Sequence, residues 1–242
     1  VAGSFYPADP TTLRATVDGF LSQVTPTAPG DAPKAMIVPH AGYIYSGPVA
    51  ASAYARLAPV RAAVRRVVLL GPSHFAPITS LATSSGDGFA TPLGTVPVDR
   101  ESVERLQALP RIEALDHAHA REHSLEVQLP FLQVTLDHFA IVPLLFGDTD
   151  PDCIAVALDA VWGDDETLIV VSTDLSHYRD YATARDIDAR TSGAILRLRP
   201  EAIGWDQACG RTGVCGLLAA AARHGLHPVL ADLRSSGDTA GP

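Results

Sequence analysis

Basic residues are scarce in this chain, which has 18 lysines and arginines against 27 aspartates and glutamates. The resulting net charge of −9 argues against a nucleic-acid-binding protein, because such proteins usually carry a basic face. Lys34 is the only lysine, and it does not follow a glycine. P-loop chemistry is therefore excluded, and Lys34 is the one lysine available for a Schiff base.

Cysteines and long apolar runs are also few. Three cysteines do not make a disulfide framework, and Cys209 and Cys215 are too far apart for a CxxC redox pair. We therefore expect an intracellular, cytoplasmic protein. No uncharged apolar window reaches the ~18 residues that a membrane span needs, and the first residues show no signal peptide. Because the chain does not begin with Met, we expect the native chain to start earlier.

The apolar residues instead form short runs at 35–38, 67–70, 140–145 and 168–171, with a weaker run at 228–231. These runs lack polar alternation, which is typical of strands buried on both faces. Helical patterns are predicted at 10–24, 47–58, 99–108, 122–137, 151–162, 179–198 and 212–224. The alternation predicts a single-domain, layered α/β/α fold with a mixed, largely parallel central sheet. Residues 25–33 read as a Pro/Gly-rich linker, and residues 80–98 as an antiparallel hairpin.

Histidines follow three of the predicted strands at equivalent positions: His40, His74 and His177. Ligands of open α/β sheets bind beyond the carboxyl ends of the strands, so we expect these imidazoles to converge if their strands are neighbours. A single loop histidine is more simply a solvated or backbone-bonded residue. Asp174 orients His177, binds a metal, or caps a helix that begins near Leu175.

Two further segments offer reactive side chains, each with a plainer interpretation. His123 and Glu126 would share one helical face, either as metal ligands or an acid–base couple, or as a surface ion pair. Cys209 precedes a predicted helix, whose N-terminus favours a thiolate nucleophile or a soft metal ligand. Cys215 and Cys153 are simpler to interpret as structural residues.

Several blocks of the chain resemble the MEMO family, whose prokaryotic members are often called AmmeMemoRadiSam system protein B. The blocks are VAGSFYP, VPHAGYIYSGPVAA, GPSHF, TPLGTVPVD, EHSLEVQLPFLQ, STDLSHY and the CG-x-x-G stretch, and they span nearly the whole chain. The resemblance implies the LigB-like fold of the class III extradiol dioxygenases, which hold a non-haem Fe(II) with two His and one Glu. Members usually continue beyond the SSGD segment with a final strand, so we expect this chain to be truncated there.

Carried over by motif, the resemblance implies that His40 and His74 ligate the metal, with Cys209 in place of the dioxygenase glutamate. It implies His177 as the acid–base residue with Asp174 beside it, and places His123 in the pocket. A thiolate is softer than a carboxylate and favours zinc or Cu(I). Fe(II) is the metal we expect first, with Cu or Zn as alternatives, and dioxygenase activity does not follow from the fold.

Three functions remain open at this point. The first is an iron-dependent, dioxygenase-like oxidoreductase that acts with a radical SAM protein and an AMMECR-type protein. The second is a catalytically silent module that binds a small molecule or a peptide. The third is a zinc-dependent hydrolase with His177 or Glu126 as base. No nucleic-acid or membrane partner is expected.

Overall fold

The computed structural model describes residues 1–25 and 32–241. The linker expected at 25–33 falls, apart from its ends, outside the described residues. A six-stranded sheet forms the centre of the molecule. Its strands, in spatial order, are β1 (Ala35–Val38), β8 (Thr167–Ser172), β2 (Arg66–Pro72), β7 (Ala140–Phe146), β3 (Leu81–Thr83) and β6 (Ile112–Ala114).

The first four strands are parallel to one another, whereas β3 runs antiparallel to β7 and carries β6 parallel to itself. Every residue of β8 is buried, because helices cover both faces of the sheet and side chains on either side pack into apolar surroundings. The predicted layered α/β fold with a mixed, largely parallel sheet is therefore confirmed.

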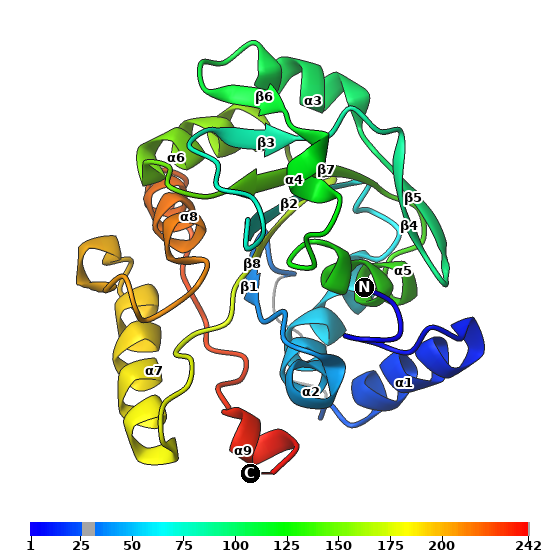
Figure 1. Ribbon diagram of the computed structural model, residues 1–242, viewed down its shortest axis with the longest axis vertical. Helices are drawn as coiled ribbons and strands as arrows, with labels where there is room; N and C mark the ends of the chain where they lie inside the picture. Colours follow the sequence, from blue (N-terminus) through cyan, green and yellow to red (C-terminus); the bar gives the residue numbers. More distant parts are fainter. Residues whose placement is uncertain (26–31, 242) are drawn as a thin grey trace.

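Helices lie on both sides of this sheet (Figure 1). On one side are α1 (Pro10–Ser22), α2 (Tyr43–Tyr54) and α5 (Leu129–Thr135), and on the other are α6 (Pro151–Ala160) and α8 (Arg211–Arg223). The remaining helical segments are α3 (Arg100–Gln107), α4 (Asp116–His119), α7 (Tyr181–Leu196), α9 (Ser236–Thr239) and the 3₁₀ turns η1 (Ala55–Val60), η2 (Glu126–Gln128) and η3 (Pro200–Ala202).

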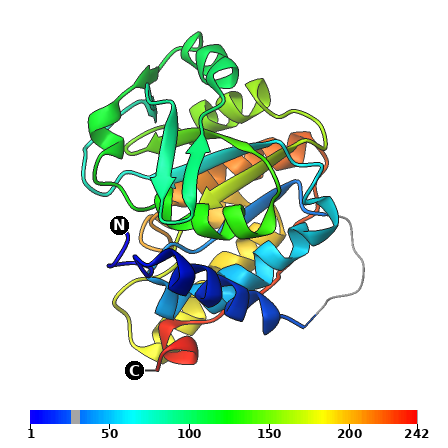
Figure 2. The same ribbon diagram turned by 90° about the vertical axis from the view of Figure 1, so that its right-hand side faces the viewer.

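The predicted hairpin is present, but it does not join the central sheet. Strands β4 (Gly88–Thr91) and β5 (Gly94–Pro97) form a separate two-stranded antiparallel sheet. Figure 2 shows this hairpin beside α5, and Gln133 of α5 links the two by bonding Thr91 and Gly94. The antiparallel member of the central sheet is instead β3, whose three residues are too few to give a periodic signal.

Two predicted elements are wrong. Residues 228–231 form no strand, and Val229 and Leu230 are 74% and 49% exposed; the described residues offer this run no strand partner. The helix predicted from residue 122 begins with η2 at Glu126 and continues as α5 from Leu129. The Glu122 side chain accepts the backbone N–H groups of His123 and Ser124, and such local bonds compete with helix formation.

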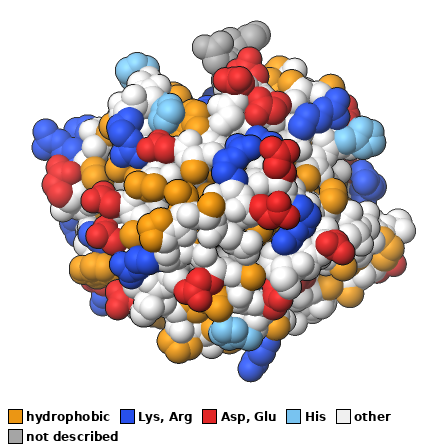
Figure 3. Space-filling view, turned by 90° about the horizontal axis from the view of Figure 1, so that it is seen from above, with side chains coloured by type: hydrophobic (Ala, Val, Ile, Leu, Met, Phe, Trp, Pro, Cys, Tyr) orange, Lys and Arg blue, Asp and Glu red, His pale blue; other side chains and the backbone are white. Residues whose placement is uncertain are grey.

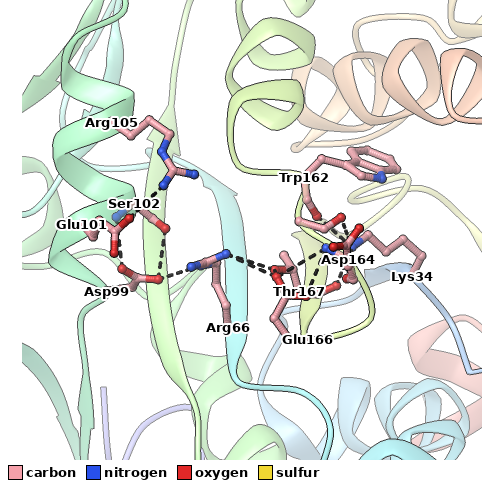
Figure 4. Close-up of polar contacts among 11 residues, drawn as sticks. Lys34, Arg66, Asp99, Glu101, Ser102, Arg105, Trp162, Asp164, Glu166 and Thr167 are labelled. Atoms are coloured by element: carbon pink, nitrogen blue, oxygen red, sulfur yellow. Dashed lines mark hydrogen bonds and ion pairs between the residues drawn. The ribbon is translucent and has the colours of Figure 1, made fainter.

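The amino ends of the strands carry a group of polar contacts (Figure 4). Arg66, which begins β2, donates to Asp99 at 2.6 Å. The Nζ atom of Lys34 donates to the backbone oxygens of Trp162, Asp164 and Thr167 at 2.6–2.8 Å. Because Lys34 precedes β1, it lies at the sheet edge opposite the strand ends that carry the histidines, where it stabilises the chain rather than offering a Schiff base.

The face shown in Figure 3 and the described helices agree with two expectations from the composition, a surface without a basic face and no membrane span. Acidic and basic side chains are interspersed over the face shown in Figure 3. Within residues 1–25 and 32–241, helices with the length and apolar character needed to cross a bilayer are absent.

Candidate metal centre

The sheet order brings three sequence-distant loops together. Strand β8 lies between β1 and β2 and is parallel to both, so their carboxyl ends meet at one edge. His40 follows β1, His74 follows β2, and Asp174 and His177 follow β8. The predicted convergence at this edge is what the strand order produces.

His40 and His74 are joined at this edge by His123. The ring centroids of His40 and His74 are 5.2 Å apart, and those of His74 and His123 are 4.7 Å apart. One ligand nitrogen of each of the three lies within 4.8 Å of the others. Metal–imidazole bonds are about 2.0–2.1 Å long, so nitrogens at this spacing can bind one ion after small side-chain shifts. The three histidines therefore form a possible metal-binding group.

His40 is held from two sides. Its backbone N–H, and that of Ala41, donate to Oδ1 of Asp174 at 2.8 Å and 3.2 Å. Its Nδ1 atom lies 2.8 Å from Oγ of Ser172, the last residue of β8. The side chain is only 2% exposed, and its Nε2 atom faces the sulfur of Cys209 at 3.3 Å. These contacts aim the Nε2 atom of His40 into the site.

His74 is held by Glu122, a buried acid that the sequence analysis did not single out. The carboxylate accepts the backbone N–H of His74 and lies 2.9 Å from its Nδ1 atom. Burial would raise the pKa of Glu122, but the bonds from His74 and Ser124 lower it to about 2. A carboxylate has no proton to donate, so it accepts a hydrogen bond from Nδ1–H of His74 and directs Nε2 of that ring toward the site.

His123 is present in the site although it does not lie on the predicted helix. Its ring stacks on Phe5 with centroids 4.3 Å apart, and burial lowers its pKa to about 4. Its Nδ1 atom is 3.2 Å from Oε1 of Glu122, but the alignment is too poor for a hydrogen bond. Among the described residues this buried nitrogen has no partner, and that cost is relieved if His123 rotates to bind a metal.

Cys209 lies beside the histidines, two residues before α8 begins. The backbone N–H of Asp174 donates to its sulfur at 3.3 Å. Burial would raise the pKa of the thiol, but His177, His40 and His74 around the sulfur lower it far below the usual cysteine range. A thiolate at a helix N-terminus is a metal ligand or a nucleophile.

His177 and Asp174 occupy the outer part of the site. His177 is exposed, and the neighbouring Cys209 sulfur raises its pKa. Asp174 does not cap a helix near Leu175, because α7 begins only at Tyr181 with Asp180 as its N-cap. Its carboxylate instead satisfies the backbone after β1, as described for His40.

Glu126, the other acid considered from the sequence, bonds outside the group of three histidines. Its Oε1 atom accepts the hydroxyl of Tyr6 at 2.6 Å. It does not pair with His123 on a helical face, because His123 precedes η2. The signal for Glu122 was available in the EHS segment, where an acid stands directly before a histidine, but only the fold brings it to His74.

Two glycines permit the close packing behind the site. A Cβ atom at Gly71 would lie 2.5 Å from Oγ of Ser124, and one at Gly210 would lie 2.6 Å from Cβ of Thr173. Real side chains do not tolerate such distances. These glycines therefore bring the loops of β2 and α8 against their neighbours and place His74 and Cys209 at the same edge.

Comparison with known proteins agrees with these motifs. The model of the family described as "Memo-like protein" matches residues 1–232. A "MEMO1 family protein" of Aquifex aeolicus is 35% identical over 252 residues, covering 100% of this chain and 92% of its own length. Namesakes from Sulfolobus acidocaldarius and Archaeoglobus fulgidus are 33% and 37% identical, covering 100% and 99% of this chain and 93% and 92% of their own lengths.

A solved structure gives a weaker likeness. The crystal structure of uncharacterized protein JW3007 from Escherichia coli K12 has a TM-score of 0.45 and 12% identity, and covers 69% of this chain and 80% of its own. A likeness at this level carries no argument about function. The family match and the curated relatives, taken with the motifs at the strand ends, show that this chain belongs to the MEMO family.

Proposed function

We propose that this chain binds one metal ion through His40, His74 and Cys209, and that it is an iron-dependent, dioxygenase-like enzyme. The observation that carries the proposal is the separation of 3.3 Å between Nε2 of His40 and Sγ of Cys209, beside the group of three histidine nitrogens. A distance of this size is what two ligands of one ion require, since metal–nitrogen and metal–sulfur bonds are about 2.0–2.3 Å long.

The donors fit such an ion. Two imidazoles and a thiolate suit Fe(II), Zn(II) or copper, and the thiolate moves the preference toward the softer metals. His123 offers a further nitrogen within reach. The carboxylate oxygens of Glu122 accept hydrogen bonds from His74, His123 and Ser124, so Glu122 is a supporting residue rather than a ligand.

A bound Fe(II) ion would supply the electron transfer and the Lewis acidity that oxygen chemistry needs. The chain itself would orient the ligands and move a proton. His177 is exposed beside Cys209 and has a raised pKa, so it can deliver a proton to a substrate at the opening of the site. Phe5 packs on His123 and shields that side of the site from water.

The substrate in this proposal is a small molecule or a peptide, and a radical SAM protein and an AMMECR-type protein are the proposed partners. The partners rest on the family resemblance alone. Nucleic acid is not proposed, because the net charge is −9 and both signs of charge mix over the face in Figure 3.

One observation favours a second candidate, a zinc-dependent hydrolase. The depressed pKa of Cys209 makes it a good zinc ligand. In that case His177 would be the base at a pH above its raised pKa, because the Glu126 carboxylate is engaged by Tyr6. A chain that binds metal without turnover would instead be a binding module.

The test is metal analysis of protein purified without oxygen, for the wild type, His40→Ala and Cys209→Ser. His117→Ala is the matched control, because His117 is exposed on α4 and does not belong to the group of three histidines. We expect about one ion per wild-type and control chain and a loss in the other two. Metal-free wild type with a reduced Cys209, after growth with ample iron and zinc, would overturn the proposal. Oxygen uptake separates the oxidoreductase from the hydrolase.

A further inference from the structure

Behind His40 lies a row of buried polar side chains that the proposed chemistry does not use. Ser172 and Tyr54 are 0% exposed, and Gln128 is 1% exposed. They come from three elements, since Ser172 ends β8, Tyr54 ends α2 and Gln128 ends η2. Buried polar groups are costly unless every donor and acceptor is paired, so the direction of each hydrogen bond here can be deduced.

The orientation of the Gln128 amide follows from its neighbours. One of its ends lies 2.8 Å from the backbone oxygen of Pro39, which can only accept, so that end is Nε2. Its Oε1 atom accepts the hydroxyl of Tyr54 at 2.9 Å. The second hydrogen of Nε2 is then directed at Oγ of Ser172, 2.8 Å away.

The Ser172 hydroxyl has one hydrogen, and a second backbone oxygen takes it. Oγ of Ser172 donates to the backbone oxygen of Ser124 at 2.6 Å, and Ser124 is itself 0% exposed. If Ser172 turned its hydrogen toward His40, that buried oxygen would lose this donor. Toward Nδ1 of His40, at 2.8 Å, Ser172 therefore acts as an acceptor.

We infer that Ser172 and Gln128 are positioning residues that hold His40 in the tautomer with its proton on Nδ1. In the neutral ring, Nε2 then has a lone pair that faces the Cys209 sulfur, where it accepts either the thiol proton or a metal ion. Nδ1 of His74 also carries a proton, but for a different reason, because a carboxylate, Glu122, faces it. The two imidazoles thus have unlike supports, a neutral hydroxyl at one and a charged acid at the other.

The tautomer itself does not depend on the proposed function; only its consequence for metal affinity does. It can be read in the metal-free protein from the two ring ¹⁵N shifts of His40, at a pH where the imidazole is neutral. A His40→Gln variant assigns the signals. We expect the Nδ1–H form in the wild type, and a shift toward the Nε2–H form in Ser172→Ala, which has no acceptor at this place.

Tyr54→Phe is the matched control. It removes one hydrogen bond of the same network, but the backbone oxygens of Pro39 and Ser124 still fix the direction of the bonds from Gln128 and Ser172. We expect Tyr54→Phe to keep the Nδ1–H form. An Nε2–H form in the wild type overturns the inference, whether or not Ser172→Ala folds. The inference is also overturned if a folded Ser172→Ala variant keeps the Nδ1–H form of His40.

A Co²⁺ titration tests the consequence. We expect Ser172→Ala to bind Co²⁺ about ten- to a hundredfold more weakly than the wild type, as for other supports of metal-binding histidines, and Tyr54→Phe to match the wild type. A shifted tautomer with unchanged affinity overturns the link to the metal. A wild type that shows the Nδ1–H form but binds no metal overturns the proposed function and leaves the tautomer inference standing.

Discussion

Oε1 of Glu122 lies 2.9 Å from Nδ1 of His74 and also accepts the backbone N–H groups of His123 and Ser124. The other oxygen, Oε2, accepts the backbone N–H of His74. One buried carboxylate thus sets the orientation of the His74 ring and the course of the backbone at His123. Four donors reach the two carboxylate oxygens, so both side-chain end atoms of residue 122 must be acceptors.

The first prediction is that Glu122→Gln weakens metal binding about ten- to a hundredfold and lowers the free energy of unfolding by about 1–3 kcal/mol. The amide N–H₂ group must face one of the four donors, so at least one buried N–H loses its acceptor. Co²⁺ titration and urea denaturation measure the two effects. Glu126→Gln, four residues along and outside the histidine group, is the control for affinity. Equal Co²⁺ affinity in Glu122→Gln and the wild type would contradict the supporting role.

The second prediction concerns alkylation of Cys209. Metal bound at the site should protect the sulfur, so adding Zn²⁺ to the metal-free protein should slow the reaction of Cys209 with iodoacetamide at least tenfold. His40→Ala should lose the protection, because the shared ion loses a ligand. Peptide mass spectrometry follows each of the three cysteines separately.

Two other cysteines serve as internal controls in that experiment. Cys215 is buried, and burial raises the pKa of its thiol, so it should react slowly under all conditions. Cys153 is partly exposed on α6, and its rate should not respond to Zn²⁺. If Zn²⁺ leaves the rate of Cys209 unchanged while the wild type demonstrably binds the ion, the thiol is not a ligand and His123 takes the third place.

The third prediction is a pH dependence from Asp99, the N-cap of α3. Its partial burial raises the pKa of the carboxyl, but the bonds from Arg66 and Ser102 outweigh this and hold it below its usual value. A pKa that is lower in the folded state stabilises the fold fully above the unfolded pKa of about 3.9. That contribution is lost as the pH falls through the lower, folded value.

Asp99→Asn isolates this charge, since Asn is also a good N-cap. We expect Asp99→Asn to be less stable than the wild type by about 1–2 kcal/mol at pH 7, with the difference shrinking as the pH falls below about 4. Urea denaturation from pH 7 to pH 3 measures it. Asp150 is the N-cap of α6, and in the described structure its carboxylate accepts a backbone N–H rather than an arginine. Asp150→Asn should therefore show a smaller change. A constant Asp99→Asn difference over that range would refute the ion-pair account.

The fourth prediction concerns Lys34, whose ammonium group donates to the backbone oxygens of Trp162, Gly163, Asp164 and Thr167. Lys34→Met removes these bonds, so that the oxygen of Asp164 keeps only the N–H of Thr167, and should lower the free energy of unfolding by about 1–3 kcal/mol. Metal affinity should not change, because Lys34 lies at the opposite edge of the sheet. Thermal unfolding and Co²⁺ titration are the two measurements. Loss of metal binding in a folded Lys34→Met protein would refute this assignment.

The strand ends could be predicted because the information is local. The apolar run at 168–171 favours burial, and its length and the polar residues after it mark both the strand and its end. The N-caps Asp9 and Asp99 are equally local, since a side chain three residues away accepts the first N–H groups of each helix. Alternation of such elements allows few arrangements other than a layered α/β fold.

Sequence alone therefore determined the layered sheet, the strands that precede His40, His74 and His177, and the family. Only the tertiary structure decided that β8 lies between β1 and β2, that Glu122 supports His74, and that Ser172 and Gln128 lie behind His40. Periodicity reports whether a side chain is buried, because burial depends on the local pattern of apolar residues. The hydrogen-bond partner of a buried polar group depends on which segments, far apart in the chain, pack against each other. A local sequence pattern does not indicate this pairing.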